Sequence, residues 1–183
     1  MNTEQEKYNT VYSNYENYAS PHQTKIDYVE AWAKNQGEKI LDAGCGRGEY
    51  CRALMRHGKI VTGVEISDVC CKKYLTDILH INTDIMSHLY SGERYDAVYC
   101  ADVLEHVPPE ELDTLLSSFK LVSNNFLFLV CSGSDKKDGV ELHLSDHSYN
   151  EWEKIFTKHF ELKKSVKGFD KWNYIHIFEC ESK

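Results

Sequence analysis

The sequence lacks the features of membrane-inserted and disulfide-bonded proteins. None of its apolar runs approaches the length of about 18 residues that a membrane-spanning helix needs. The stretch MNTEQEKYNT at the start contains no apolar core of a signal peptide. The seven cysteines form no C-x-x-C pair, which argues against a zinc ribbon or a thioredoxin-type site. We therefore expect a cytoplasmic protein with reduced thiols and no membrane partner.

Basic residues are also scarce. The chain has 21 Lys and Arg against 29 Asp and Glu, which gives a formal net charge of -8. A nucleic-acid interface needs clustered Lys and Arg to neutralise phosphates, so nucleic acid is not an expected partner. With 42% hydrophobic and 27% charged residues, the 183-residue chain has the composition of one globular domain.

Strand and helix patterns alternate along the chain. Apolar, β-branched runs predict strands at 39–43, 59–66, 77–82, 95–101 and 126–132. Helical spacing or helix-start signals predict helices within 22–35, after Gly48, within 108–122 and within 148–160. Two more strands, near 161–167 and 173–180, follow one another without a helix between them. This order predicts an α/β fold with a mostly parallel sheet, helices on both faces and one antiparallel edge strand.

The stretch KILDAGCGRGEY, residues 39–50, contains three glycines at alternate positions from Gly44 onward. A glycine-rich turn between a strand and a helix lets backbone N–H groups approach a ligand. A dinucleotide fingerprint needs glycine at the sixth position of the motif, where this chain has Glu49. Asp42, just before the turn, is equally unsuited to a phosphate. It suits a cationic ligand with a free amino group.

Two further acids end the next two predicted strands. Glu65 lies 21 residues after Gly44, a spacing that suits a carboxylate accepting hydrogen bonds from both ribose hydroxyls. The alternative is a surface acid that begins a turn. Asp84 ends the third strand and is placed either to accept from an adenine amino group or to cap a helix. Ligands bind beyond the carboxyl ends of parallel strands, so these acids are expected at one site.

The segments ILDAGCGRGEY, VTGVEIS, INTDI and YDAVYCADVLEHV, in this order, resemble class I S-adenosylmethionine-dependent methyltransferases. The resemblance covers about residues 22–132. It implies a Rossmann-like, seven-stranded sheet whose last strand is antiparallel, with S-adenosyl-L-methionine as cofactor and S-adenosyl-L-homocysteine as product. The cofactor-binding residues that it implies are Tyr12, Asp42, Gly44, Cys45, Gly46, Glu65, Ile66, Asp84, Ile85 and Ala101.

The resemblance also gives roles to these positions. Asp42 is expected near the cofactor amino group, Glu65 on the ribose and Ile66 against adenine. Asp84 and the Ile85 backbone are expected at the adenine edge. The backbone around Ala101 is expected to meet the methionine part.

The N-terminal segment carries Tyr8, Tyr12 and Tyr15 near helical spacing. In similar enzymes a first helix closes over the cofactor, often with a tyrosine hydroxyl on its carboxylate. We therefore expect residues 1–20 to form a helical lid and residues 21–183 to form the S-adenosylmethionine-binding methyltransferase domain. The alternative is a tyrosine stripe that only packs on the sheet.

Candidates for the acceptor side are Asp102, His106 and His143. His143 is the first choice as general base or acceptor-orienting group, and His147 is the second. The alternative for each histidine is a hydrogen bond to backbone without a catalytic role. Glu105, with His106, is alternatively only an anchor for the next helix. No ligand set for a metal ion is apparent in the sequence.

The expected function is methyl transfer to an O or N atom of a small-molecule acceptor, by a monomer or homodimer. The chain lacks the Asn/Asp-Pro-Pro-Tyr element of nucleobase amino methylation and the Pro-Cys nucleophile of cytosine C5 methylation. Two alternatives remain open. One is a catalytically silent module or partner subunit that binds the cofactor. The other is an aminopropyltransferase, in which Asp102 and Glu105 hold a polyamine.

Overall fold

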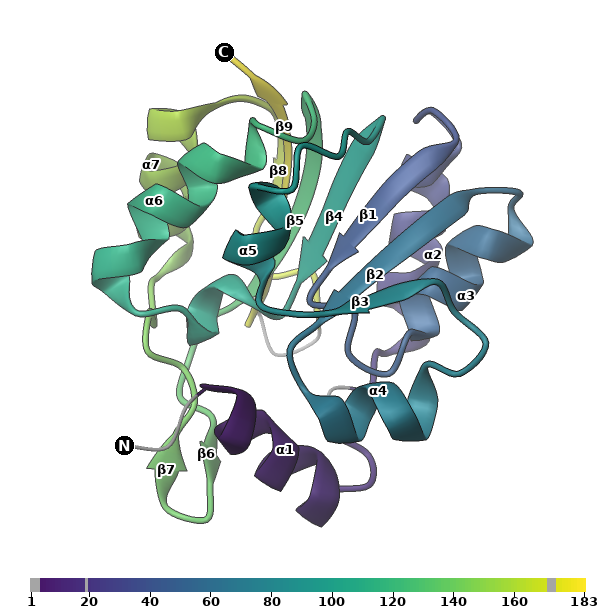
Figure 1. The fold of residues 1–183 in the computed structure, drawn as a ribbon. Helices are drawn as coiled ribbons and strands as arrows, with labels where there is room; N and C mark the ends of the chain where they lie inside the picture. Colours follow the sequence, from purple (N-terminus) through teal and green to yellow (C-terminus); the bar gives the residue numbers. More distant parts are fainter. Residues whose placement is uncertain (1–3, 19, 171–173) are drawn as a thin grey trace.

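The computed structural model describes residues 4–18, 20–170 and 174–183. Seven strands form one sheet in the order β3-β2-β1-β4-β5-β9-β8 (Figure 1). Their bounds are β1 Lys39–Ala43, β2 Ile60–Glu65, β3 His80–Asn82, β4 Ala97–Ala101, β5 Asn125–Cys131, β8 Phe160–Val166 and β9 Ile175–Ser182. The predicted α/β fold with a mostly parallel sheet is confirmed, since β1 to β5 pair in parallel.

The C-terminal strands differ from the prediction in one respect. The last strand, β9, is antiparallel to both neighbours, as expected. Its expected position at the edge is wrong, because β9 lies between β5 and β8. The side chains explain this order. β9 has Ile177 and Phe178 to bury, whereas β8 carries Lys163 and Lys164, which suit a solvent-facing edge. Residue 173, the expected start of β9, lies outside the described residues.

Helices cover both faces of the sheet, as predicted. One face packs against α2 Gln23–Ala33, α3 Glu49–Arg56 and α4 Asp68–Tyr74. The other packs against α5 Ile85–Leu89, α6 Pro109–Phe119 and α7 Tyr149–His159. Successive strand residues alternate between the two cores: Leu127 faces the α2 side and Phe128 faces the α7 side.

The short elements near the carboxyl ends of the strands were not predicted. They are α4, α5, the 3-10 helix η1 Leu104–His106 and a hairpin of β6 Lys136–Lys137 with β7 Val140–Glu141. Their apolar runs are too short to show a helical period. The capping box that begins α7 is confirmed. The Ser148 side chain accepts from the backbone N–H of Glu151, and the Glu151 side chain accepts from the backbone N–H of Ser148.

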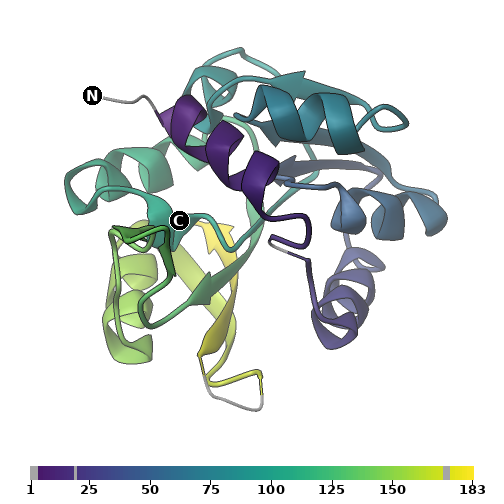
Figure 2. The ribbon, with the colours of Figure 1, turned by 90° about the horizontal axis from the view of Figure 1, so that it is seen from below.

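The N-terminal helix α1, Glu4–Asn14, crosses the carboxyl ends of the parallel strands (Figures 1 and 2). Gln5 donates to the carbonyl of Ile66, directly after β2. At the other end of the helix, the hydroxyl of Tyr15 donates to Asp138 in the β6–β7 hairpin. Hydrogen bonds therefore hold the α1 segment to the turn after β2 and to the β6–β7 hairpin.

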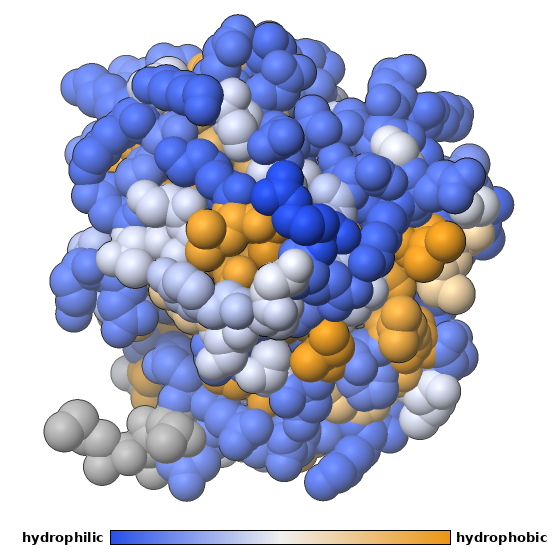
Figure 3. Space-filling model, turned by 45° about the horizontal axis from the view of Figure 1, so that its top comes forward, coloured by the Kyte–Doolittle hydropathy of each residue, from blue (hydrophilic) through white to orange (hydrophobic). Residues whose placement is uncertain are grey.

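Among the described residues, no helix combines the length and apolar character that crossing a bilayer requires. Figure 3 tilts the end of the sheet remote from α1 toward the viewer. This face is mostly hydrophilic and shows separate hydrophobic patches. Single exposed hydrophobic residues are normal on a protein surface and need no partner.

We predict that Phe128→Ala destabilises the fold strongly. The Phe128 ring is fully buried and stacks on Phe126 and Phe156 at centroid distances of 5.8 and 4.9 Å. Its removal leaves a cavity and should lower the free energy of unfolding by about 3–5 kcal/mol, measured by urea titration. Leu79→Ala is the control, because Leu79 is 63% exposed and should change this free energy by less than about 0.5 kcal/mol. Equal losses in both variants would contradict the assignment of the core.

Candidate active site

A cavity of about 1280 Å³ lies at the carboxyl ends of the strands. All the predicted cofactor and catalytic residues line it: Tyr12, Asp42, Gly44, Cys45, Gly46, Glu65, Ile66, Asp84, Ile85, Ala101, Asp102, His106 and His143. His147, the second choice among the histidines, does not. Its ring lies edge-on against Trp152, with the centroids 5.0 Å apart.

The glycine turn after β1 forms one wall of the cavity. Gly44 donates to the carbonyl of Val64 at 2.9 Å, which ties the turn to β2. The φ angles of Gly44 and Gly46 are +81° and +52°, a region that side chains disfavour. A Cβ atom on Gly44 would lie 2.3 Å from Val103, and one on Gly46 would lie 3.1 Å from the Tyr12 hydroxyl. The backbone conformation therefore favours glycine at both positions, and at Gly44 the space does so as well.

Glu65, at the end of β2, is buried, with only 6% of its surface exposed. One carboxylate oxygen accepts from the backbone N–H of Gly46 at 3.1 Å, and the other accepts from that of Ser67 at 2.8 Å. Burial raises the pKa of Glu65, against the lowering effect of these hydrogen bonds. The alternative of a surface acid is wrong. Glu65 links the glycine turn to the turn after β2.

Asp42, in β1, is 1% exposed and accepts a hydrogen bond from the Cys51 thiol at 3.1 Å. Burial raises the pKa of Asp42 to about 7, and the nearby Glu65 and Glu49 add to the rise. Near neutral pH this carboxyl group is therefore present in both its protonated and its ionised form. A cation beside it would favour the ionised form.

Asp84 is exposed and caps α5. Its two carboxylate oxygens accept from the Ser87 backbone N–H at 2.8 Å and from the Ser87 hydroxyl at 2.6 Å. The helix-cap alternative is therefore confirmed. Asp84 nevertheless lines the cavity, together with Ile85.

Lys25 is a cavity residue that the sequence-based assignment missed. Its ammonium group contacts both carboxylate oxygens of Asp102, at 2.6 and 2.9 Å. Asp102 has a φ of 52°, unusual for a residue with a side chain, and strain of this kind clusters at functional sites. A signal was present in the sequence: Lys25 shares the buried face of α2 with Val29 and Trp32.

The two cavity histidines are both held by backbone carbonyl groups. The Nδ1–H of His106 donates to Leu142 at 3.0 Å, and that of His143 donates to Gly133. The hydrogen bonds to backbone that the alternative expected are thus present, and both rings line the cavity. Burial and the neighbouring His143 lower the pKa of His106 to about 4, so its imidazole is neutral at pH 7.

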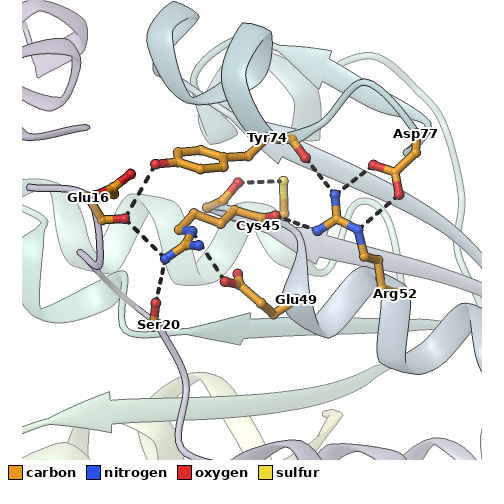
Figure 4. Close-up of polar contacts among 9 residues, drawn as sticks. Glu16, Ser20, Cys45, Glu49, Arg52, Tyr74 and Asp77 are labelled. Carbon is orange, nitrogen blue, oxygen red and sulfur yellow. Dashed lines mark hydrogen bonds and ion pairs between the residues drawn. The ribbon is translucent and has the colours of Figure 1, made fainter. Parts of the chain in front are cut away.

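Arg47 connects the glycine turn to the chain between α1 and α2. Its guanidinium donates to the Glu16 carbonyl at 3.2 Å and to the Ser20 hydroxyl at 2.6 Å. The same group lies over the Tyr74 ring, 4.7 Å from its centroid. Figure 4 shows Glu16, Ser20 and Tyr74 gathered around this contact. These partners are distant in sequence, so no local pattern could have indicated the role of Arg47.

A family profile described as a methyltransferase domain matches residues 15–179. The chain belongs to this methyltransferase family. The recognition of a class I methyltransferase from the sequence motifs is therefore confirmed.

Relatives of the chain include two proteins named ubiquinone biosynthesis O-methyltransferase. The one from Coxiella burnetii is 37% identical over 91 residues, which cover 46% of this chain and 39% of that protein. The one from Saccharophagus degradans is 30% identical over 106 residues, which cover 54% of this chain and 44% of that protein. The alignments thus span less than half the length of either relative.

Two solved structures share the fold of the chain. The 1,6-didemethyltoxoflavin-N1-methyltransferase of Burkholderia thailandensis, with 1,6-didemethyltoxoflavin and S-adenosylhomocysteine bound, has a TM-score of 0.78 at 16% identity. The comparison covers 98% of this chain and 87% of that chain. The magnesium protoporphyrin IX methyltransferase of Synechocystis PCC 6803, with S-adenosylhomocysteine bound, has a TM-score of 0.68 at 23% identity. Here the coverage is 88% and 84%.

We predict that Arg47→Ala loosens the segment that follows α1. Loss of the hydrogen bonds to Glu16 and Ser20 should speed amide hydrogen exchange over residues 15–18 by roughly 5–10-fold, measured by mass spectrometry. Arg56→Ala is the matched control, since Arg56 contacts only Glu30 in the described ion pairs. Unchanged exchange in Arg47→Ala would rule out this tether.

Proposed function

We propose that this chain is an S-adenosylmethionine-dependent methyltransferase that transfers the methyl group to an O or N atom of a small-molecule acceptor. The main support is one observation: Asp42, Glu65 and Asp84, from the ends of neighbouring strands, line one cavity beside a glycine turn. Family membership supports the reaction type. The names of the relatives, an O-methyltransferase of ubiquinone biosynthesis and an N1-methyltransferase, support small-molecule acceptors.

Each of the three carboxylates binds a different part of the cofactor. Asp42 accepts a hydrogen bond from the amino group of the cofactor. This group is a cation, and it stabilises the ionised form of the buried Asp42 carboxyl group, whose pKa is raised. Glu65 accepts from the ribose hydroxyls, and Ile66 packs against adenine. Asp84 accepts from the adenine amino group, and the backbone N–H of Ile85 lies beside it. The Asp84 oxygens keep free lone pairs for this in addition to those that cap α5.

The remaining cofactor contacts come from backbone and from α1. Gly44, Cys45 and Gly46 lie beneath the cofactor, and the Ala101 backbone meets its methionine part. Tyr12, in α1, covers the open side of the cavity. Residues 1–20 thus act as a lid on the domain formed by residues 21–183. Residues 1–3 and 19 of this lid lie outside the described residues. A lid of this kind excludes water and gates entry.

The chemical step is an in-line displacement at the methyl carbon. A lone pair of the acceptor atom forms the new bond, the carbon–sulfur bond breaks, and its electron pair stays on sulfur as a neutral thioether. Alignment of the two reactants can lower the barrier by roughly 7–11 kcal/mol. His106 and His143 face the acceptor. The ion pair of Lys25 with Asp102 fixes the wall between acceptor and cofactor.

The size and charge of the site support a small acceptor. A volume of about 1280 Å³ exceeds the roughly 300–1,000 Å³ of a site for one drug-sized ligand, so there is room for two reactants. The net charge of -8 opposes nucleic acid as the acceptor. We also propose a cytoplasmic location, because all seven cysteines are free thiols, and a monomeric or homodimeric state.

Aminopropyl transfer is not favoured. A polyamine needs free carboxylates, yet the Asp102 carboxylate is already paired with Lys25. Glu105, the other acid considered for this role, is fully buried, with a pKa raised by burial and by nearby Asp102.

Replacing Glu65 tests the proposed function. We expect Glu65→Ala to weaken S-adenosylmethionine binding by about 1–3 kcal/mol through lost charged hydrogen bonds, roughly 5–150-fold by calorimetry. Methyl transfer from tritium-labelled cofactor to a metabolite extract should fall in parallel. Glu93→Ala, on the surface, should change neither. Tight binding by the wild type without any transfer would identify a silent module instead.

Asp42 should make cofactor binding depend on pH. The empty protein holds a proton on Asp42 below a pKa of about 7, whereas the cofactor ammonium group favours the ionised carboxylate. Binding therefore releases a proton, and affinity should rise roughly tenfold between about pH 5.5 and pH 7, then level off. Calorimetry in buffers of different ionisation enthalpy measures this proton. Asp42→Asn should bind more weakly at pH 7 and lose the pH dependence; an unchanged dependence would contradict the contact.

A further inference from the structure

Three side chains with metal-binding atoms converge at the acceptor side of the cavity. Glu105 and His106 come from η1, and His143 comes from the segment after the β6–β7 hairpin. One potential ligand atom from each lies within 4.8 Å of the other two. The two imidazole rings meet edge to face, with centroids 4.8 Å apart.

Both histidines are fixed in the tautomer that a metal ion needs. A carbonyl oxygen can only accept, so the Nδ1 atoms that contact Leu142 and Gly133 must carry the protons. The Nε2 atoms of His106 and His143 are then left with free lone pairs. Metal-binding histidines are typically oriented by this kind of hydrogen bond from the other ring nitrogen.

Glu105 supplies the third ligand atom. Its side chain is fully buried, and one carboxylate oxygen accepts from the Cys131 backbone N–H at 2.9 Å. The other oxygen, Oε2, is buried without a hydrogen-bond partner. An unpaired buried carboxylate oxygen is costly, and a cation would remove that cost. The nearby cation Lys25 contacts Asp102 instead.

We propose that Glu105, His106 and His143 bind a divalent transition-metal ion at the acceptor end of the cavity. Two imidazole nitrogens and one carboxylate oxygen suit Zn²⁺, Fe²⁺ or Mn²⁺ better than Ca²⁺ or Mg²⁺, which prefer oxygen ligands. Bonds of about 2.0–2.2 Å place ligand atoms within roughly 4.4 Å of each other, so the side chains rotate slightly inward on binding. Three protein ligands leave positions open toward the cavity, as in catalytic metal sites.

The metal ion narrows the acceptor class, an inference that rests on the proposed function. An acceptor hydroxyl bound at an open position becomes more acidic and releases its proton to solvent at neutral pH. The resulting metal-bound oxygen attacks the methyl carbon while the carbon–sulfur bond breaks and its electrons remain on sulfur. The acceptor is then an oxygen nucleophile, and His143 acts through the metal instead of as a general base.

Metal binding is tested directly, without cofactor or acceptor. Chelator-treated wild-type protein is titrated with Zn²⁺ or Mn²⁺ by calorimetry, and the Co²⁺ form is examined by absorption spectroscopy. We expect one ion per chain and d–d bands typical of nitrogen and oxygen ligands. His143→Ala and Glu105→Gln should each lower affinity by more than about 100-fold. Glu105→Gln keeps the shape and a hydrogen-bonding group but removes the charge.

His147→Ala is the matched control, because His147 lies four residues away and outside the cavity. It should bind the metal as the wild type does. S-adenosylmethionine affinity should persist in His143→Ala, which shows that the variant is folded. Absence of stoichiometric binding by the wild type, or equal affinity in His143→Ala, overturns the metal site. Methyl transfer by metal-free protein would overturn the role of the metal ion in the reaction while leaving the methyltransferase function intact.

Discussion

The buried carboxylate of Glu65 holds the two turns that shape the cavity. It accepts from the backbone of Gly46 after β1 and of Ser67 after β2, and so links the two turns. Helix α1 is fastened to the same place through Gln5 and the carbonyl of Ile66. The two turns and helix α1 are therefore held at adjacent residues, Glu65 and Ile66. The position of the acid follows from the sheet, because β2 ends there beside β1.

The parallel sheet has an electrostatic consequence. Since the strands end at the same edge, their terminal acids gather at one end of the molecule, and burial raises the pKa of Asp42, Glu65 and Glu105. Such a site is poorly suited to an anion and well suited to a ligand with positive charge. Lys25 neutralises only one of the acids, Asp102. Arg47 and Lys137, which also line the cavity, pair with Glu49 and Asp135, so among the described residues Asp42, Glu65 and Glu105 have no ion-pair partner.

The two halves of the cavity were not equally readable from the sequence. The cofactor half is local, because Gly44 directly follows β1 and Glu65 ends β2. Their position at one cavity agrees with the prediction. The acceptor half is built from distant segments, so His143 could be placed but its partner at Gly133 could not. His147, the second choice in the sequence, lies just before α7 and packs on Trp152 instead.

The sequence by itself determined the alternation of strands and helices, the glycine turn and the acids at or near the ends of β1, β2 and β3. These features depend on residues close together in the chain, where periodicity and turn chemistry are directly visible. Only the tertiary structure decided that β9 lies inside the sheet and that Lys25 pairs with Asp102. It alone brought Glu105 and His106 beside His143. Such contacts join segments distant in sequence, and burial and packing choose among the pairings that the local patterns leave open.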